Sequence, residues 1–133
     1  MSELINDPAI RTLRSALNGL SLRQRAIADN VANISTPGYK AVRVSFEGAL
    51  QRQLQKGGAT RLARTSAGHL DPEADDVGIS VKRDQSQSMR LDGNNVDVDW
   101  EMARLAETVI NYNTVSELVS IKLAILKNIV NGR

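Results

Sequence analysis

The sequence contains no cysteine, so a disulfide framework and a thiolate site for metal binding or catalysis are both excluded. It contains a single histidine, which stands in no recognisable nucleophile motif. Phosphate-binding loops and dinucleotide-binding fingerprints are missing too. These absences argue against an enzyme, and we expect no cofactor.

Long apolar runs are also missing. No stretch of about 18 apolar residues occurs, which excludes a membrane-spanning helix by length. Residues 2–7 include two acids and no basic residue, so we expect no cleaved secretory signal. If this protein leaves the cytoplasm, another export route must carry it.

Aromatic residues are scarce, with one Phe, one Trp and two Tyr. Basic residues such as Arg61, Arg64, Lys82 and Arg83 favour nucleic-acid binding, but the net charge is only +2 and no aromatic residue lies among them. We therefore expect no nucleic-acid partner. A basic nucleic-acid binder stays as an alternative, which a steep salt dependence of DNA binding would reveal.

Two groups of potential metal ligands occur, and neither predicts a metal site. The first is a loop cluster without repeated spacing, in which a solvated acidic loop is the simpler interpretation; it consists of His69, Asp71, Glu73, Asp75 and Asp76. The second group, Asp92, Asn94, Asp97 and Asp99, resembles a calcium loop. That interpretation fails because Asp97 replaces the required Gly and Ala103 replaces the required Glu.

What the sequence does contain is a long apolar stripe at each end, with residues spaced alternately by three and four. The N-terminal stripe consists of Ile10, Leu13, Leu17, Leu20, Ile27, Val31 and Ile34. The C-terminal stripe consists of Met102, Leu105, Val109, Tyr112, Val119, Leu123, Leu126 and Val130. The stripes predict helices over residues 8–33 and 99–131 that face each other as an antiparallel coiled-coil hairpin, with the chain ends together. The expected fold class is therefore mainly α.

A second stripe on the C-terminal helix consists of Leu118, Ile121, Ile125 and Ile129. Together with the first stripe it leaves the last third of that helix apolar around most of its circumference, which a two-helix hairpin cannot cover. We expect this stripe to pack against adjacent subunits.

Turn and cap residues predict the remaining organisation. Asp7 caps the first helix, and Pro37-Gly38 occupies the centre of a type II turn with positive φ at Gly38. A short helix is expected over residues 45–56 with Phe46, Leu50 and Leu54 on one face, and residues 57–98 are expected to be irregular with a small β-hairpin. That hairpin would pair the stretch of Ile79 and Val81 with the stretch of Met89 and Leu91. Residues 92–95 predict a turn, after which Asp99 caps the last helix.

The charges are unevenly distributed. Residues 8–64 hold ten Lys and Arg against two Asp and Glu, whereas residues 71–107 hold four against ten. Opposite surfaces of neighbouring copies could meet through this asymmetry, but two solvated faces explain it as well.

The segment over residues 16–47 reads ALNGLSLRQRAIADNVANISTPGYKAVRVSFE. It resembles the N-terminal signature of bacterial flagellar axial proteins, the rod, hook and hook-associated subunits, in which AIA-x-N-x-AN-x-x-TPGYK ends the first helix. The stretch DGNNVDVDWEMARLAE at residues 92–107 and the short chain resemble the proximal rod subunits within that family.

The resemblance implies a self-associating structural protein, exported uncleaved into the periplasm by the flagellar export apparatus. Its partners would be other copies, other rod proteins, and the export gate and rotor ring at the base of the rod. The rod would transmit torque and enclose an export channel. It also implies three units, 1–40, 41–98 and 99–133, completed by assembly. The assembly residues would be Leu13, Leu17, Leu20, Ile27, Asn30, Asn33, Pro37, Gly38, Tyr39, Met102, Leu105, Val109, Leu118, Ile121, Ile125 and Ile129. A soluble coiled-coil adaptor or export chaperone stays open as an alternative.

Near the end of the first helix, Asn30 and Asn33 could hydrogen-bond neighbouring backbone, and Gly38 permits the chain to reverse. A local helix stop without partner contacts explains each residue equally well.

Overall fold

The computed structural model describes residues 7–56, 78–88 and 90–132. Its elements are α2 (Pro8–Ala32), β1 (Val42–Ser45), α3 (Glu47–Lys56), β2 (Ser80–Arg83) and α4 (Val98–Val130). The prediction of a mainly α fold with two long terminal helices, a short middle helix and a small sheet is confirmed. In this described part of the chain, no helix is both long enough and apolar enough to cross a membrane.

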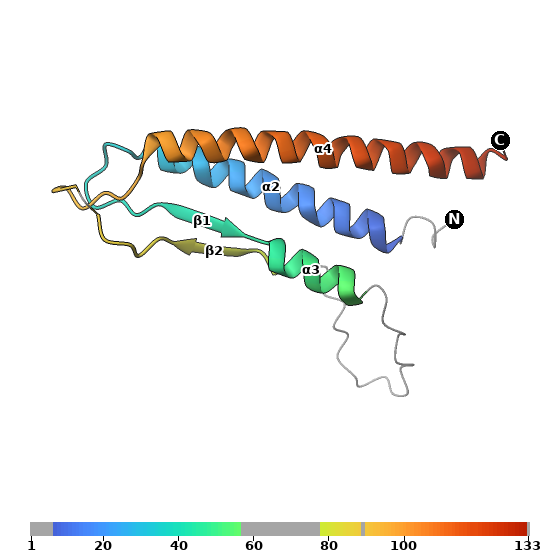
Figure 1. The fold of residues 1–133 in the computed structure, drawn as a ribbon, viewed down its shortest axis with the longest axis horizontal. Helices are drawn as coiled ribbons and strands as arrows, with labels where there is room; N and C mark the ends of the chain where they lie inside the picture. Colours follow the sequence, from blue (N-terminus) through green and yellow to red (C-terminus); the bar gives the residue numbers. More distant parts are fainter. Residues whose placement is uncertain (1–6, 57–77, 89, 133) are drawn as a thin grey trace, which may run out of the picture.

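The molecule is elongated (Figure 1). Helix α2 contacts α4, β1 and α3, and β1 also reaches α4 through the ion pair of Arg43 with Glu101. The two long helices run antiparallel, so the start of α2 and the end of α4 lie at the same end of the molecule. The Lys122 ammonium lies 2.8 Å from the Asp7 carboxylate and joins the helices there. This arrangement confirms the predicted hairpin.

The predicted cap of α2 is confirmed, and that of α4 is wrong by two residues. The Ala9 N–H donates to the Asp7 carboxylate at 2.8 Å. At the start of α4, the N–H groups of Asp99 and Trp100 donate to Asp97 at 3.0 and 3.3 Å, so Asp97 is the N-cap and Asp99 lies in the first turn. Either aspartate could cap a helix here, and the first one reached by the chain does so.

The face of α4 that lies against α2 differs in phase from the predicted stripe. Leu105, Tyr112, Val119 and Leu126 are half-buried, as the stripe predicted, but Met102, Val109, Leu123 and Val130 are exposed. The inner positions between the first four are instead Glu101, Thr108, Val115 and Lys122. Because three of these four residues are polar, a prediction from the apolar pattern assigns the inner positions to their exposed apolar neighbours instead. The heptad spacing was right, and every second position was displaced by one residue.

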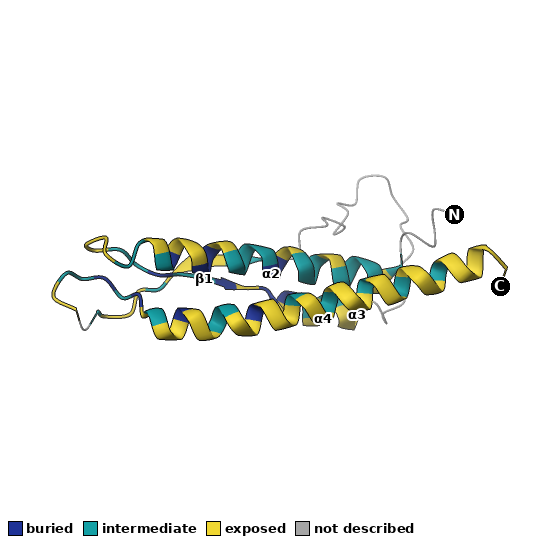
Figure 2. Ribbon diagram, turned by 90° about the horizontal axis from the view of Figure 1, so that it is seen from above, coloured by how far each residue is buried: buried dark blue, intermediate teal, exposed yellow. Residues whose placement is uncertain are grey.

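Helix α2 is more enclosed than α4, because it contacts α4, β1 and α3. Figure 2 shows much of α2 as buried or intermediate and most of α4 as exposed. Leu20 and Ile27 of the predicted stripe are buried, and Leu13 and Leu17 are half-buried. The core cluster joins Leu20 and other α2 residues to the sheet side; its buried members are Leu20, Ala26, Val44 and Phe46.

The predicted β-hairpin is wrong in its pairing. Strand β2 pairs antiparallel with β1, with Val81 opposite Val44, and not with residues 89–91. Leu91 lies in a turn that the Gly93 N–H closes on the Arg90 carbonyl at 3.1 Å. Met89, the acidic cluster of residues 69–76, Arg61 and Arg64 lie outside the described residues.

The short helix also begins later than predicted. Strand β1 occupies residues 42–45, and α3 begins at Glu47. Phe46 is buried at this junction and Leu50 is half-buried, whereas Leu54 is 63% exposed. The alternation of Val42 and Val44 is a strand pattern, and it places Val44 in the core beneath α2.

Gly19 in α2 permits the close approach of the Phe46 ring. A Cβ at this position would lie 2.5–2.7 Å from three ring carbons. We expect Gly19→Ala to destabilise the chain by up to about 2 kcal/mol, because the cost of overpacking, about 1–3 kcal/mol, exceeds the helix propensity of about 1 kcal/mol that alanine adds. Urea unfolding followed by circular dichroism measures this.

Gly48→Ala is the matched control, because α3 leaves open space around that position. It is expected to leave the chain as stable or more stable. Equal effects of the two substitutions would show that Phe46 does not constrain Gly19.

Candidate functional site

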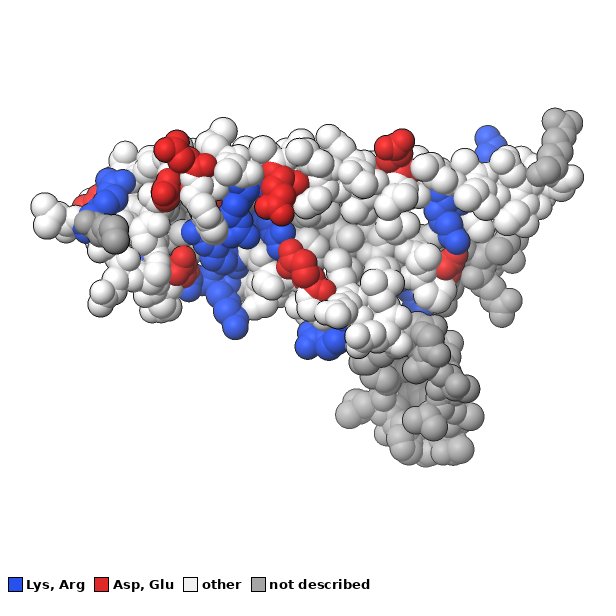
Figure 3. All heavy atoms as spheres, in the orientation of Figure 1, with Lys and Arg blue, Asp and Glu red and all other residues white. Residues whose placement is uncertain are grey.

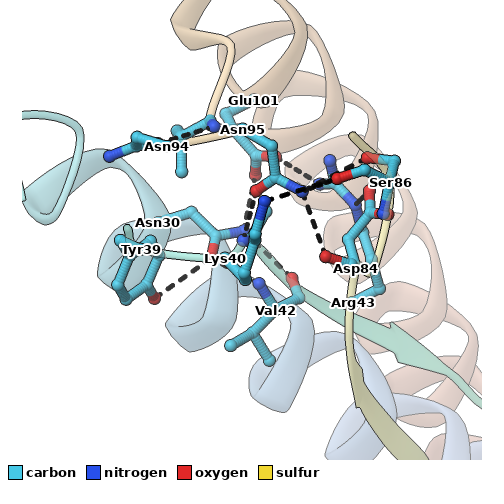
Figure 4. Close-up of polar contacts among 12 residues, drawn as sticks. Asn30, Tyr39, Lys40, Val42, Arg43, Asp84, Ser86, Asn94, Asn95 and Glu101 are labelled. Carbon is cyan, nitrogen blue, oxygen red and sulfur yellow. Dashed lines mark hydrogen bonds and ion pairs between the residues drawn. The ribbon is translucent and has the colours of Figure 1, made fainter. Parts of the chain in front are cut away.

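A network of hydrogen bonds and ion pairs joins α2, β1 and α4 at the end of the molecule opposite the chain termini (Figure 4). We call this network the polar junction. Its members are Asn30, Tyr39, Arg43, Asn94, Asn95 and Glu101.

Asn30 lies at the centre of the polar junction and is fully buried. Its amide oxygen accepts from the Val42 N–H at 2.7 Å, and its amide nitrogen donates to the Val42 carbonyl at 2.9 Å. The same nitrogen donates to Glu101 at 3.1 Å, and the Tyr39 hydroxyl donates to the amide oxygen at 3.3 Å. The asparagine thus attaches β1 to α2 as a neighbouring strand would. The prediction that Asn30 bonds nearby backbone is confirmed.

Glu101 is a fully buried carboxylate at the first inner position of α4. Arg43 forms an ion pair with it, and the Arg43 side chain is 24% exposed. The Arg43 guanidinium also lies 3.6 Å from Asp84. The backbone N–H and hydroxyl of Ser86 lower the pKa of the Asp84 carboxyl, and Arg43 adds a smaller effect. Burial raises the pKa of the Tyr39 hydroxyl. Sequence reasoning missed Glu101 and Arg43.

The two segments that resemble the axial signature bind each other at the polar junction. The Asn94 amide donates to the carbonyls of Asn33, Ile34 and Thr36 at 2.9, 3.0 and 2.9 Å. It therefore satisfies acceptors that the end of α2 leaves open. Asn95 accepts from the Ala41 N–H at 2.8 Å. These contacts show that residues 92–95 have a role beyond the turn that the sequence predicted.

Asn33 has a local role, because its amide donates to the Asp29 carbonyl at 2.8 Å within the last turn of α2. The predicted bond to neighbouring backbone is confirmed.

The predicted type II turn follows. The Tyr39 N–H donates to the Thr36 carbonyl at 3.2 Å, and Gly38 has φ of +71°. The Gly38 N–H also donates to the Asp92 carbonyl at 2.8 Å, so the turn is attached to the segment before α4.

We expect Gly38→Val to block incorporation into a rod while expression is retained. A β-branched residue at positive φ is strained by about 1–2 kcal/mol, although no atom lies near enough to clash with its Cβ. Gly38→Asn is the control, because asparagine tolerates this backbone region. Immunoblots of purified basal bodies measure incorporation, and normal incorporation of the valine variant would contradict the prediction.

The second feature is an exposed apolar face on α4. Leu118, Ile121, Ile125 and Ile129 are 48%, 50%, 49% and 61% exposed. Leu123 and Val130 are exposed as well, on the other flank of the half-buried side of α4, and Figure 2 shows α4 largely exposed toward its C-terminal end. Such a continuous apolar face on a helix is typical of a protein interface.

The predicted assembly residues thus divide into two groups. Leu20, Ile27 and Asn30 are buried, and Leu13, Leu17, Asn33, Tyr39 and Leu105 are half-buried, so these residues chiefly stabilise the chain itself. Pro37, Gly38, Met102, Val109, Leu118, Ile121, Ile125 and Ile129 are exposed. The second group is therefore available to another subunit.

The geometry defines a class of protein. The described residues form a thin helical molecule with an apolar helix face on its surface, and they contain no cluster of His, Asp and Glu that could hold a metal ion. An exposed apolar face on a thin helical molecule is typical of a structural subunit that binds other proteins.

Comparison with known proteins identifies the family. The model of the flagella basal body rod protein family matches residues 10–40. The flagellar basal body rod protein FlgB of Bacillus subtilis is 37% identical over 123 residues, which cover 92% of this chain and 93% of that protein. FlgB of Salmonella typhimurium is 30% identical over 131 residues, 95% of each chain. FlgB of Borrelia hermsii is 35% identical over 108 residues, 77% of this chain and 80% of that protein. The chain belongs to the flagellar basal body rod proteins of the FlgB type, and it is a structural subunit of the rod.

Proposed function

We propose that this subunit assembles with other copies of itself and with other rod proteins into the proximal part of the rod. There it contributes to a shaft that transmits torque and encloses the export channel, and at the rod base it contacts the export gate and rotor ring. The protein reaches the periplasm through the flagellar export apparatus without cleavage of a signal peptide, and it acts without catalysis. Units 1–40, 41–98 and 99–133 form one body that assembly completes.

The exposed apolar face of α4 supports this proposal most directly. Burying one such side chain stabilises a contact by roughly 1.5–3 kcal/mol, and four of them share one face at helical spacing. In water the same face promotes aggregation. A neighbouring helix is the natural cover, because heptad spacing suits helix packing.

Detergent extraction of basal bodies from the source bacterium tests the proposal. A tagged copy of the chain is expected to co-purify with the extracted basal bodies and to show its native N-terminus by mass spectrometry. A discrete soluble oligomer absent from basal bodies would support the adaptor alternative. Retention on DNA that falls steeply with salt would support the nucleic-acid alternative.

A further inference from the structure

The single tryptophan lies in an unusual charged environment near the start of α4. Trp100 is 46% exposed. The Arg43 guanidinium lies 4.0 Å from the centre of its ring system, and the Arg104 guanidinium lies 4.6 Å from it. Both distances are in the range of cation–π contacts. Figure 3 shows basic side chains gathered over this part of the molecule.

The two arginines whose charges act on Arg104 both have carboxylate partners, whereas Arg104 has none among the residues that the structure describes. Arg23 forms an ion pair with Glu47, and Arg43 forms ion pairs with Glu101 and Asp84. In the described part of the chain, the Arg104 guanidinium has neither a hydrogen bond nor an ion pair, and Arg104 is half-buried. Burial lowers the pKa of the Arg104 guanidinium, and the charges of Arg43 and Arg23 lower it further. A carboxylate beside Arg104 would relieve this repulsion.

The position of Arg104 on α4 places it on the proposed assembly face. Arg104, Leu118 and Ile125 are separated by 14 and 7 residues, and Trp100 and Ile121 by 21, which are whole heptads. Residues at these spacings lie in rows along one side of a helix that packs in heptads. The same side of α4 therefore carries Trp100 and Arg104 near its start and the apolar face in its C-terminal half, with the polar residues Glu107, Asn111 and Thr114 between them.

Copies that pack side by side in one orientation bring the charged first turns of their α4 helices together. The exposed acids there are Asp97, Asp99 and Glu107. Asp97 is engaged as the N-cap, and Glu107 already acts on Arg104 within its own chain. The Asp99 carboxylate has no hydrogen bond or ion pair among the described residues. It is thus free to meet a cation of another chain.

We propose that Trp100 and Arg104 form a docking site for Asp99 of a second copy, packed beside the first in the same orientation. Five residues separate Asp99 from Arg104, so the two copies are displaced along the helix axis by roughly 7.5 Å at 1.5 Å per residue. This inference rests on the proposed function, because it names the partner at the same assembly face.

Charge reversal tests the docking site. Arg104→Glu is expected to reduce incorporation into basal bodies at least 10-fold, and Arg104→Glu with Asp99→Arg in the same chain is expected to restore most of it. Arg25→Glu is the matched control, because Arg25 is an exposed arginine of α2. Normal incorporation of Arg104→Glu, or rescue by Glu107→Arg in place of Asp99→Arg, would overturn the proposal.

If charge reversal unfolds the chain, cross-linking provides a second test of the docking site. Because the sequence has no cysteine, Arg104→Cys and Asp99→Cys chains each carry one thiol. A short bismaleimide is expected to join the two variants in assembled material more efficiently than it joins Arg25→Cys to Asp99→Cys. Equal yields would overturn the docking site.

The two proposals fail in distinguishable ways. If wild-type chain is absent from basal bodies, the proposed function itself is wrong, whereas failure of the Arg104 tests alone leaves the proposed function intact.

Discussion

Replacing Asn30 with alanine is expected to lower the free energy of unfolding by about 2–4 kcal/mol. The Asn30 amide makes four hydrogen bonds, two of them to the Val42 backbone, and the residue is fully buried. Its removal leaves the Val42 N–H, the Val42 carbonyl and Glu101 without these partners. Each buried polar group left unpaired costs about 1–3 kcal/mol, and partial access of water reduces the sum. Urea unfolding followed by circular dichroism measures the change.

Asn33→Ala is the matched control for this prediction. Asn33 belongs to the same helix end, but it is half-buried, and its side chain makes two exposed hydrogen bonds, one to the Asp29 carbonyl and one from the Thr36 hydroxyl. We expect this substitution to cost about 1 kcal/mol or less, because water can replace both of these exposed hydrogen bonds. Similar losses for the two variants would mean that Asn30 does not hold β1 against α2.

The local features of this fold were predictable because they depend on neighbouring residues. Asp7 followed by Pro8 begins α2, and Pro37-Gly38 forms the turn after it. The sequence also predicts that Asn30 can hydrogen-bond to backbone groups near the end of this helix. Caps and turns of this kind are local chemistry, so the sequence contains the required information.

The phase of α4 was not predictable from its apolar pattern. The inner positions include Glu101, Thr108 and Lys122, while exposed Met102 and Val109 lie beside them. A pattern rule assigns polar residues to solvent, yet Glu101 pairs with Asn30 and Arg43, and Lys122 pairs with Asp7. Partners in other elements make these polar residues suitable for inner positions, and the helix sequence alone does not reveal them.

Long-range pairings account for the other differences. Arg43 and Glu101 are 58 residues apart in the chain, and β1 and β2 are separated by α3 and the segment after it. A charged residue is expected on the solvent-exposed surface unless its partner in another element is known. A short strand can pair with any edge that the fold brings near, so Val81 opposite Val44 depended on the placement of α2 and α4.

Changing Leu118 and Ile125 together to glutamine is expected to abolish rod assembly and to keep the subunit soluble and exportable. Both side chains are about half-exposed, at 48% and 49%, so the isolated chain loses little burial. A contact that encloses them would lose roughly 3–6 kcal/mol, since each buried side chain contributes roughly 1.5–3 kcal/mol. That loss corresponds to roughly a 100- to 10,000-fold weaker contact, because about 1.4 kcal/mol is tenfold.

Leu54→Gln with Val81→Gln is the matched control, because these side chains are 63% and 53% exposed on α3 and β2, away from the face of α4. The control pair is expected to build normal rods, and the α4 pair is expected to accumulate as soluble subunit. Immunoblots of basal bodies and of the soluble fraction distinguish the two results. Normal rods from the α4 pair would show that Leu118 and Ile125 remain in water after assembly, because glutamine could not replace leucine and isoleucine in an enclosed apolar contact without this loss.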